Sequence, residues 1–328
     1  MNSNPKHIVK LVSLILLYIA LGVLGVYHIS SLVLFPVLAL PFAVFCSKDK
    51  ISINEHIFIQ FIMGIGIYAV TGTWISVGVY LISICVPTYV ILFFYKKELP
   101  LPNIIMYATL CLSVVVFVFL SIMKGLGNDL HAQFSEYLSE MKNIPIETIQ
   151  GWLTTQTATV AMSSSEISQM SFDMKEFITN MVEMLSIFWS SLILIQVLFS
   201  TSFLIIVLNC IIRRKNKKFP SAKELLNFKL SKVAVLILFI ALLAIDVNGS
   251  NEAMTILGAN VMFFLMTLFQ IAGLLGLIGI LSKAVIGKSL KILAYVLVVI
   301  LFSTVPYVIM SFGCLDAIFN YRKVEIVV

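Results

Sequence analysis

The stretch that decides the fold is residues 253–282, AMTILGANVMFFLMTLFQIAGLLGLIGILS, which contains no charged side chain. A helix needs about twenty consecutive apolar residues to cross the hydrocarbon core, because every backbone amide must be bonded inside its own segment. Runs such as 192–212 and 293–310 are also apolar on every side, rather than at alternate positions. This pattern favours membrane helices over the strands of a transmembrane barrel.

The composition of the whole chain agrees with this interpretation. Hydrophobic residues make up 60% of the 328 residues, charged residues only 12%, and the mean hydropathy is +1.05. Soluble domains carry roughly 25% charged residues, so a water-soluble fold is excluded and the lipid bilayer is the expected environment. The net charge of +6 does not indicate a nucleic-acid partner, because the basic residues cluster beside apolar segments, where they set orientation.

Nine apolar segments predict an all-α fold, a polytopic transmembrane helix bundle of about nine spans, within a range of eight to ten. The first apolar run continues to Val26, and we interpret it as a membrane helix rather than a cleaved signal peptide. We divide the chain into an N-terminal five-helix membrane segment, a polar insertion and a C-terminal membrane segment, which are residues 1–123, 124–184 and 185–328. The segments are residues 8–28, 30–46, 56–73, 75–95, 104–123, 185–212, 233–247, 253–282 and 290–315.

Prolines predict distortions inside three of these segments. Pro36 and Pro41 in the second segment and Pro87 in the fourth are expected to kink or shorten their helices, because proline removes a backbone donor and crowds the preceding turn. Pro306 would break the last segment into two shorter pieces.

Residues 124–184 form the only long polar insertion, and it is acidic. Apolar residues recur at helical spacing in two stretches, one beginning at Leu130 and the other at Ile167. The second stretch follows Ser163-Ser164-Ser165-Glu166, a capping-box pattern. We expect two or three amphipathic helices, which either form a lid or surface element or simply pack on the bundle. The charged residues are Asp129, Glu136, Glu140, Glu147, Glu166, Asp173, Glu176 and Glu183 against Lys124, Lys142 and Lys175.

The loop of residues 213–232 is strongly basic, with Glu224 as its single acid. By the positive-inside rule the loop is cytoplasmic, which places the N-terminus in the cytoplasm and the acidic insertion outside. The same run would also suit anionic lipid. Counting nine spans from the loop puts Arg322 and Lys323 outside, which conflicts with the same rule.

Motifs for catalysis or for a cofactor are absent from the sequence. It contains no His-Glu-x-x-His, no phosphate-binding Gly-x-x-x-x-Gly-Lys-Ser/Thr, no Gly-x-Ser-x-Gly and no Cys-x-x-Cys. We therefore expect no enzyme, no cofactor and no metal site. The cysteines, which we interpret as small hydrophobic residues, are Cys46, Cys85, Cys111, Cys210 and Cys314.

The eighth segment carries uncharged polar residues on one face. At 3.6 residues per turn, Asn260 and Thr267 fall within about 20° of each other, and Gln270 lies about 60° further round. The small residues Ala272 and Gly276, with Gly258, lie on the roughly opposite side and suit close helix contact. The polar face either lines a ligand cavity or makes hydrogen bonds between helices, which are worth only about 0.6 kcal/mol on average in membranes.

Asp316 and Arg322 lie at the end of the last apolar segment. They are candidates to pair with each other, to cap or anchor the helix, or to hold a charged ligand. Together with Asn260, Thr267 and Gln270 they form the predicted ligand-binding set.

The closing stretch Gly313-Cys-Leu-Asp316-Ala-Ile-Phe-Asn320-Tyr-Arg322-Lys323 resembles the C-terminus of the YybS-like family of predicted bacterial multi-pass membrane proteins, which typically ends in Gly-Leu-Leu-Asp followed by Phe-Asp-Phe-Arg-Lys. The Pro-containing stretch 35–41 and the pair Leu208-Asn209 before a basic run are similar too. Asn320 and Tyr321 depart from the family's Asp and Phe, and Ser231-Lys232 replace a common proline. The resemblance implies a bacterial plasma membrane protein.

The same resemblance implies kinship with the substrate-binding components of energy-coupling-factor transporters, which work with a separate ATPase module. The resulting expectation is a membrane protein that binds a small-molecule ligand between its later helices and works in transport with an ATPase or another membrane partner protein. The alternative is a scaffold or regulatory membrane protein that contacts partners through its outer insertion or through loop 213–232.

Overall fold

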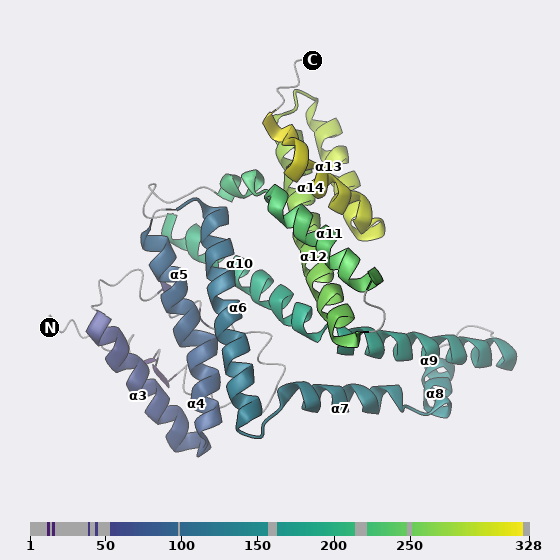
Figure 1. Cartoon of the computed structure of the whole chain (residues 1–328), viewed down its shortest axis with the longest axis horizontal. Helices are drawn as coiled ribbons and strands as arrows, with labels where there is room; N and C mark the ends of the chain where they lie inside the picture. The colour runs from purple at the N-terminus through teal and green to yellow at the C-terminus, as the bar shows by residue number, and fades with distance from the viewer. Residues whose placement is uncertain are drawn as a thin grey trace. The chain divides into compact units, whose positions relative to one another are not determined.

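The computed structural model of the chain describes residues 53–97, 99–156, 163–213, 222–247 and 251–323, together with seven single positions between 12 and 44. These residues form twelve α-helices, α3 to α14, and no strand (Figure 1). The all-α prediction is confirmed. The predicted spans 8–28 and 30–46, with Pro36 and Pro41, lie almost entirely outside the described residues, as does most of the basic run that begins at Arg213.

The helices group into two compact units. The first comprises Met1–Phe119, Leu194–Lys232 and Thr267–Val328, and the second comprises Leu120–Ile193 and Val233–Met266. The long helices α6, α10 and α12 contribute residues to both units. The three-part division at residues 123 and 184 stays a prediction.

In the first unit, α3 packs against a helical run that changes character in the middle. This run begins as α4, continues as the π-helical segment η2 and ends as α5, with Pro87 in the first turn of α5. The π segment ends two residues before the proline, as expected of a residue that removes a donor from the helix ladder. Met63, Ile67, Tyr80 and Ile84 form the core between these helices. The bounds are Ile53–Thr71 for α3, Trp74–Tyr80 for α4, Leu81–Cys85 for η2 and Val86–Lys96 for α5.

Three described helices are long and apolar enough to cross a membrane. They are α6 (Leu101–Gly125), α10 (Trp189–Arg213) and α12 (Glu252–Lys283), and they match the predicted spans 104–123, 185–212 and 253–282. The helix α11 (Lys232–Val247) has only 16 residues, fewer than the roughly twenty that an upright span needs. The described residues support three spans, or four with the bent pair below, so the predicted count of about nine is not confirmed.

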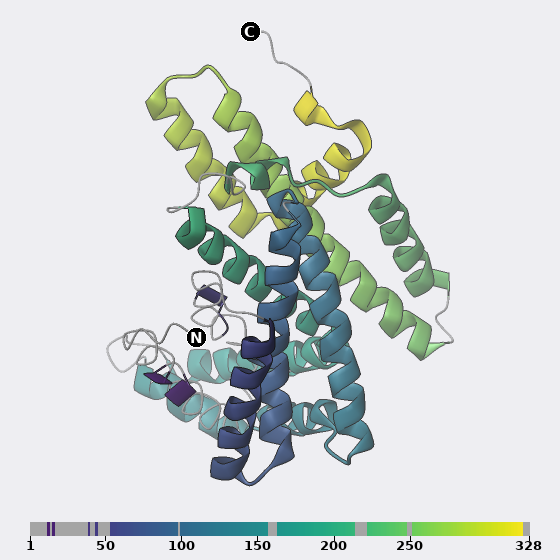
Figure 2. The ribbon, with the colours of Figure 1, turned by 90° about the vertical axis from the view of Figure 1, so that its left-hand side faces the viewer.

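The last predicted span is broken. Helices α13 (Lys288–Thr304) and α14 (Pro306–Phe319) meet at a bend of 107° (Figure 2). Val305 has φ −134° and ψ 65°, outside the helical region, because a residue that precedes proline is pushed away from it. The break expected from Pro306 is therefore confirmed.

In the second unit, the polar insertion folds into three helices, as predicted. They are α7 (Leu130–Lys142), α8 (Ile146–Gln156) and α9 (Ser164–Ile187). They share a core whose buried side chains are Leu138, Ile149, Leu153, Ile178 and Val182.

Carboxylate side chains take part in the N-terminal caps of two helices in the insertion. Asp129 caps α7 by accepting bonds from the amides of His131 and Ala132, and Ser163 with Glu166 forms the predicted capping box of α9. The Ala132 amide, helped by Lys124, holds the pKa of the Asp129 carboxyl below its ordinary value. Hydrogen bonds from the Ser163 amide and hydroxyl lower the pKa of Glu166 in the same way.

Candidate functional site

The C-terminal site begins with a close crossing of α12 and α14. A Cβ atom added to Gly273 would collide with the Ile309 carbonyl oxygen, and one added to Gly313 would collide with that of Phe269. The two backbones touch because neither glycine has a side chain, which is how small residues act between membrane helices. On α14 the buried residues Ile309, Gly313, Asp316 and Ala317 share one face, since they are spaced by four, three and one. The crossing therefore turns Asp316 toward α12.

Asp316 and Arg322 form an ion pair in this apolar setting. Arg322 Nε lies 2.8 Å from Asp316 Oδ2, and the two side chains are 11% and 6% exposed. Removing two charges from water costs several kcal/mol for each ion, so such a pair persists only where further polar contacts support it. Of the roles that the sequence left open for these two residues, the structure shows the pairing, and ligand binding stays a prediction.

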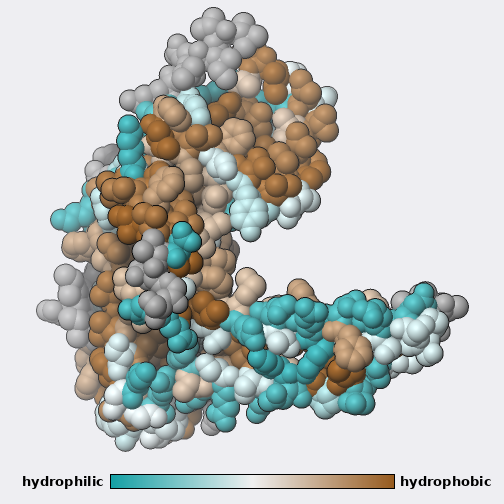
Figure 3. Space-filling model, turned by 45° about the vertical axis from the view of Figure 1, so that its right-hand side comes forward, coloured by the Kyte–Doolittle hydropathy of each residue, from teal (hydrophilic) through white to brown (hydrophobic). Residues whose placement is uncertain are grey.

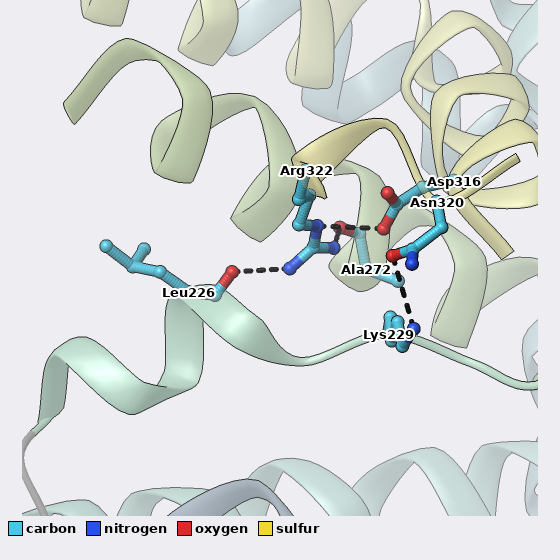
Figure 4. Close-up of polar contacts among 6 residues, drawn as sticks. All are labelled: Leu226, Lys229, Ala272, Asp316, Asn320 and Arg322. Carbon is cyan, nitrogen blue, oxygen red and sulfur yellow. Dashed lines mark hydrogen bonds and ion pairs between the residues drawn. The ribbon is translucent and has the colours of Figure 1, made fainter. Parts of the chain in front are cut away.

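Arg322 also binds two main-chain carbonyl groups (Figure 4). Its Nη1 donates to the Leu226 oxygen and its Nη2 to the Ala272 oxygen, the latter at 3.0 Å. Gly276 leaves room for the guanidinium, because a Cβ atom there would lie 3.0 Å from Nη2. The guanidinium thus joins α12 to the short helix η3 (Ala222–Asn227).

Two further contacts hold η3 and the residues after it against the end of α14 and the start of α6. Lys229 Nζ donates to Asn320 Oδ1 over 3.2 Å, and Asn320 is the left-handed cap of α14, with φ 56°, a conformation that asparagine tolerates better than most residues. Glu224 accepts a bond of 3.3 Å from the amide of Leu101 at the start of α6. We call Asp316, Asn320 and Arg322, with their partners Leu226, Lys229 and Ala272, the C-terminal latch.

The Asp316 carboxylate keeps acceptor capacity inside the latch. Both of its oxygens are buried, and neither accepts an aligned hydrogen bond from any described residue, although Arg322 Nε approaches to ion-pair distance. The short distance between Nε and Oδ2 shows that the two charges are in contact, but the N–H group of Arg322 is not aimed closely enough at the carboxylate for a hydrogen bond. A carboxylate offers about four acceptor sites, so a donor group of a ligand or a water molecule would fit Asp316 chemically.

The other predicted site residues lie on α12. Asn260 belongs to the second unit, where its Nδ2 donates to the oxygens of Ile187 (2.7 Å) and Ile256 (2.9 Å), and its Oδ1 accepts from the Ser191 amide (2.9 Å). These bonds tie α12 to the junction of α9 and α10. Thr267 and Gln270 belong to the first unit and are half-buried. Of the five predicted residues, the structure brings Asp316 and Arg322 together.

Several contacts of the latch could not be recognised from the sequence. The partners of Arg322 are main-chain oxygens, which every residue possesses. The glycines offered a partial signal: Gly258 was expected to meet a neighbouring helix and does lie against Ala241 of α11, whereas Gly276 receives the Arg322 side chain instead. Among the described residues, no group of three or more His, Cys, Asp or Glu is placed to hold a metal ion.

The helices, the apolar spans and the buried ion pair define a helical integral membrane protein. The chain belongs to the family described as "Predicted membrane protein (DUF2232)", whose model matches residues 15–317. This agrees with the resemblance to YybS-like membrane proteins. No curated protein and no solved structure matches the chain.

Proposed function

We propose that the chain is a non-enzymatic membrane component that binds a small polar ligand beside the C-terminal latch, within a transport system driven by a separate ATPase or another membrane partner. The observation that carries the proposal is the buried Asp316 with its unused acceptor capacity. Ionisable residues inside membrane bundles are costly and mark ligand or ion pathways in most proteins that keep them. The ligand should therefore donate hydrogen bonds or carry positive charge.

Among the predicted neutral residues, Gln270 lies nearest along α12 to the crossing with α14, and we propose that it assists Asp316. It lies about 60° round α12 from Gly273, where α14 crosses, and it is half-buried. The YybS-like resemblance would imply kinship with the substrate-binding components of energy-coupling-factor transporters, which by analogy of fold class supports the same role and stays a proposal. No phosphate-binding motif is present in the sequence, so the proposal assigns the energy source to the partner.

The proposal is tested on the full chain, purified into nanodiscs from its native membrane. Small molecules released from the protein are identified by mass spectrometry. We expect the wild-type protein to retain a compound that Asp316→Asn loses. Asp246→Asn, which changes an exposed carboxylate at the end of α11, should retain it. Equal recovery from all three proteins, or none from the wild type, would contradict the proposal.

Two further variants separate binding from folding. The double variant Asp316→Leu/Arg322→Leu removes both charges together, which commonly leaves stability unchanged or improved, and it should still lose the compound. Gln270→Leu should weaken retention without unfolding the protein. Asn260→Leu is a poorer probe, because it also removes the bonds to Ile187 and Ser191.

We also propose that the chain lies in a bacterial plasma membrane with its N-terminus, loop 213–232 and C-terminus all in the cytoplasm. Arg322 binds Leu226 and Asn320 binds Lys229, so residues 320–322 lie with the described part of the basic loop that the positive-inside rule puts inside. Lys291 Nζ binds the Ser282 oxygen at the other end of the bent pair. The pair α13 and α14 would then enter and leave the membrane on its cytoplasmic side. Arg322 and Lys323 would lie in the cytoplasm, as the positive-inside rule requires.

Reporter fusions test this orientation. A reporter joined after Val328 should give a cytoplasmic signal, and one inserted between Gln156 and Ser163 should give an external signal. An external signal from the C-terminal fusion would show that α13 and α14 cross the membrane together.

A further inference from the structure

Helix α9 carries two apolar stripes, and the described residues cover only one of them. The inner stripe packs on α7 and α8. The second, which we call the outer seam, consists of large side chains that are 45%, 40%, 64% and 55% exposed at Met170, Met174, Phe177 and Met184, with Met181 half-buried between them. Isolated exposed apolar residues need no explanation, but a continuous row marks an interaction site. The inner stripe is Ile167, Ser171, Ile178, Val182 and Leu185.

The spacing of the outer seam fits a second helix. Its residues are separated by four, three, four and three positions, the 3.5-residue repeat by which one helix packs along another. The seam extends over about 21 Å, at 1.5 Å per residue, which is about two heptads. Methionine side chains are flexible and polarisable, and surfaces rich in them bind amphipathic helices of varied sequence.

The charge around the seam defines the chemistry of the partner. Glu166 and Asp173 lie about 40° and 60° from the middle of the seam, and both are exposed. The two lysines of the three helices are engaged elsewhere: Lys142 pairs with Glu183 at 2.7 Å, and Lys175 donates to the Lys142 and Ile144 oxygens. Neither lysine therefore offsets the charge of Glu166 and Asp173 beside the seam. Figure 3 shows hydrophilic residues over most of the visible face of α7, α8 and α9.

This acidity discriminates between three occupants of the seam. A second copy of the chain would bring Glu166 and Asp173 against like charges, which is unfavourable across a helix interface. An anionic membrane surface would be repelled for the same reason, because helices that lie on such membranes carry lysine and arginine on their polar face. A basic amphipathic helix satisfies both the apolar row and its acidic border.

We propose that the outer seam of α9 docks a basic amphipathic helix of another protein, with the apolar side of that helix packed on Met174 and Phe177. This inference does not depend on the proposed transport function. It assigns a binding surface and a class of partner to the insertion, whichever ligand the latch binds.

The test uses the full chain in nanodiscs of zwitterionic lipid and a labelled three-heptad synthetic helix with leucine at its core positions and lysine at the flanking positions. A peptide with glutamate in place of lysine is the control, and binding is followed by fluorescence anisotropy against empty discs. We expect the basic peptide to bind at least about tenfold more tightly than the acidic one. Added salt should weaken this preference, because exposed charges are screened.

Variants locate the binding. Met174→Gln/Phe177→Ser should weaken binding of the basic peptide by about tenfold or more, since a few buried anchors carry most of the energy of such an interface. Phe172→Ser is the matched control: it changes a 55% exposed aromatic residue of the same helix, about 160° from the middle of the seam, and should leave binding unchanged. Both variants change exposed side chains, so folding should be retained.

Three outcomes would overturn the proposal. Unchanged binding in the Met174/Phe177 variant would show that the peptide adsorbs elsewhere. A change from dimer to monomer in that variant, measured by light scattering, would assign the seam to a second copy of the chain. A photoreactive residue at position 177 that cross-links to lipid in cells, rather than to protein, would assign it to the membrane surface.

Discussion

The C-terminal latch and the α7–α9 insertion use polar residues in opposite ways. In the latch, Asp316 is buried, and the guanidinium of Arg322 joins it to two carbonyl groups, while α13 beside it exposes residues such as Leu293 and Val299. In the insertion, the acids face outward and the apolar side chains of Leu138 and Ile149 are buried. The difference teaches that the two regions suit different solvents. The membrane part buries its polar side chains and exposes apolar ones to lipid, whereas the insertion exposes its polar side chains to water.

The largest expected effect comes from breaking the ion pair of the latch. Arg322→Gln leaves the Asp316 carboxylate buried without its counter-charge, and we expect it to lower the free energy of unfolding by about 3–5 kcal/mol. Unfolding in mixed detergent micelles measures the loss. The double variant Asp316→Leu/Arg322→Leu should recover most of it. A loss below about 1 kcal/mol for Arg322→Gln would mean that water reaches the pair and would remove the contrast with the insertion.

The next effect concerns the crossing of α12 and α14. Gly273→Ala places a methyl group against the Ile309 carbonyl, so the helices must separate, at a cost of about 1–3 kcal/mol. The same micelle experiment measures it. Gly125→Ala is the control, because nothing lies within 4 Å of a Cβ atom at that position. Equal effects of the two substitutions would show that the crossing is loose.

A glycine of the insertion should respond with the opposite sign. Gly151 lies in α8 with open space around its added Cβ, so Gly151→Ala should stabilise the protein by about 0.5–1 kcal/mol through helix propensity. Thermal unfolding followed by circular dichroism measures the gain. A destabilised variant would reveal a partner or neighbour that covers this face of α8.

The smallest effect is the pH dependence of the helix caps. Because the folded-state pKa values of Asp129 and Glu166 are lowered, their stabilisation is complete above the ordinary carboxyl pKa of about 4. It is lost as the pH falls through the lowered values. Hydrogen exchange at the first turns of α7 and α9 should therefore speed up at acid pH relative to its intrinsic rate. Asp129→Asn, which keeps a capping side chain, should abolish this change in α7 alone.

The sequence predicted the features that depend on neighbouring residues. The capping box of Ser163 and Glu166 follows from a spacing of three residues, and the break at Pro306 follows from the missing amide and from the restricted residue before it. The pairing of Asp316 with Arg322, six positions apart, was one of three roles that the sequence left open, and the structure selected it. The span count is not confirmed, because two predicted spans lie almost entirely outside the described residues. Hydropathy also does not distinguish a crossing helix from the bent pair α13 and α14.

The sequence by itself determined that this is a helical membrane protein and where many of its helices begin, bend and end, because hydropathy and capping act over a few residues. Only the tertiary structure decided which helices meet. Arg322 reaches carbonyl groups 96 and 50 residues away, and Gly273 meets Gly313, through main-chain atoms common to every residue. Asn260 likewise binds main-chain groups of α9 and α10. Contacts of this kind are selected by packing, which leaves no local pattern in the sequence.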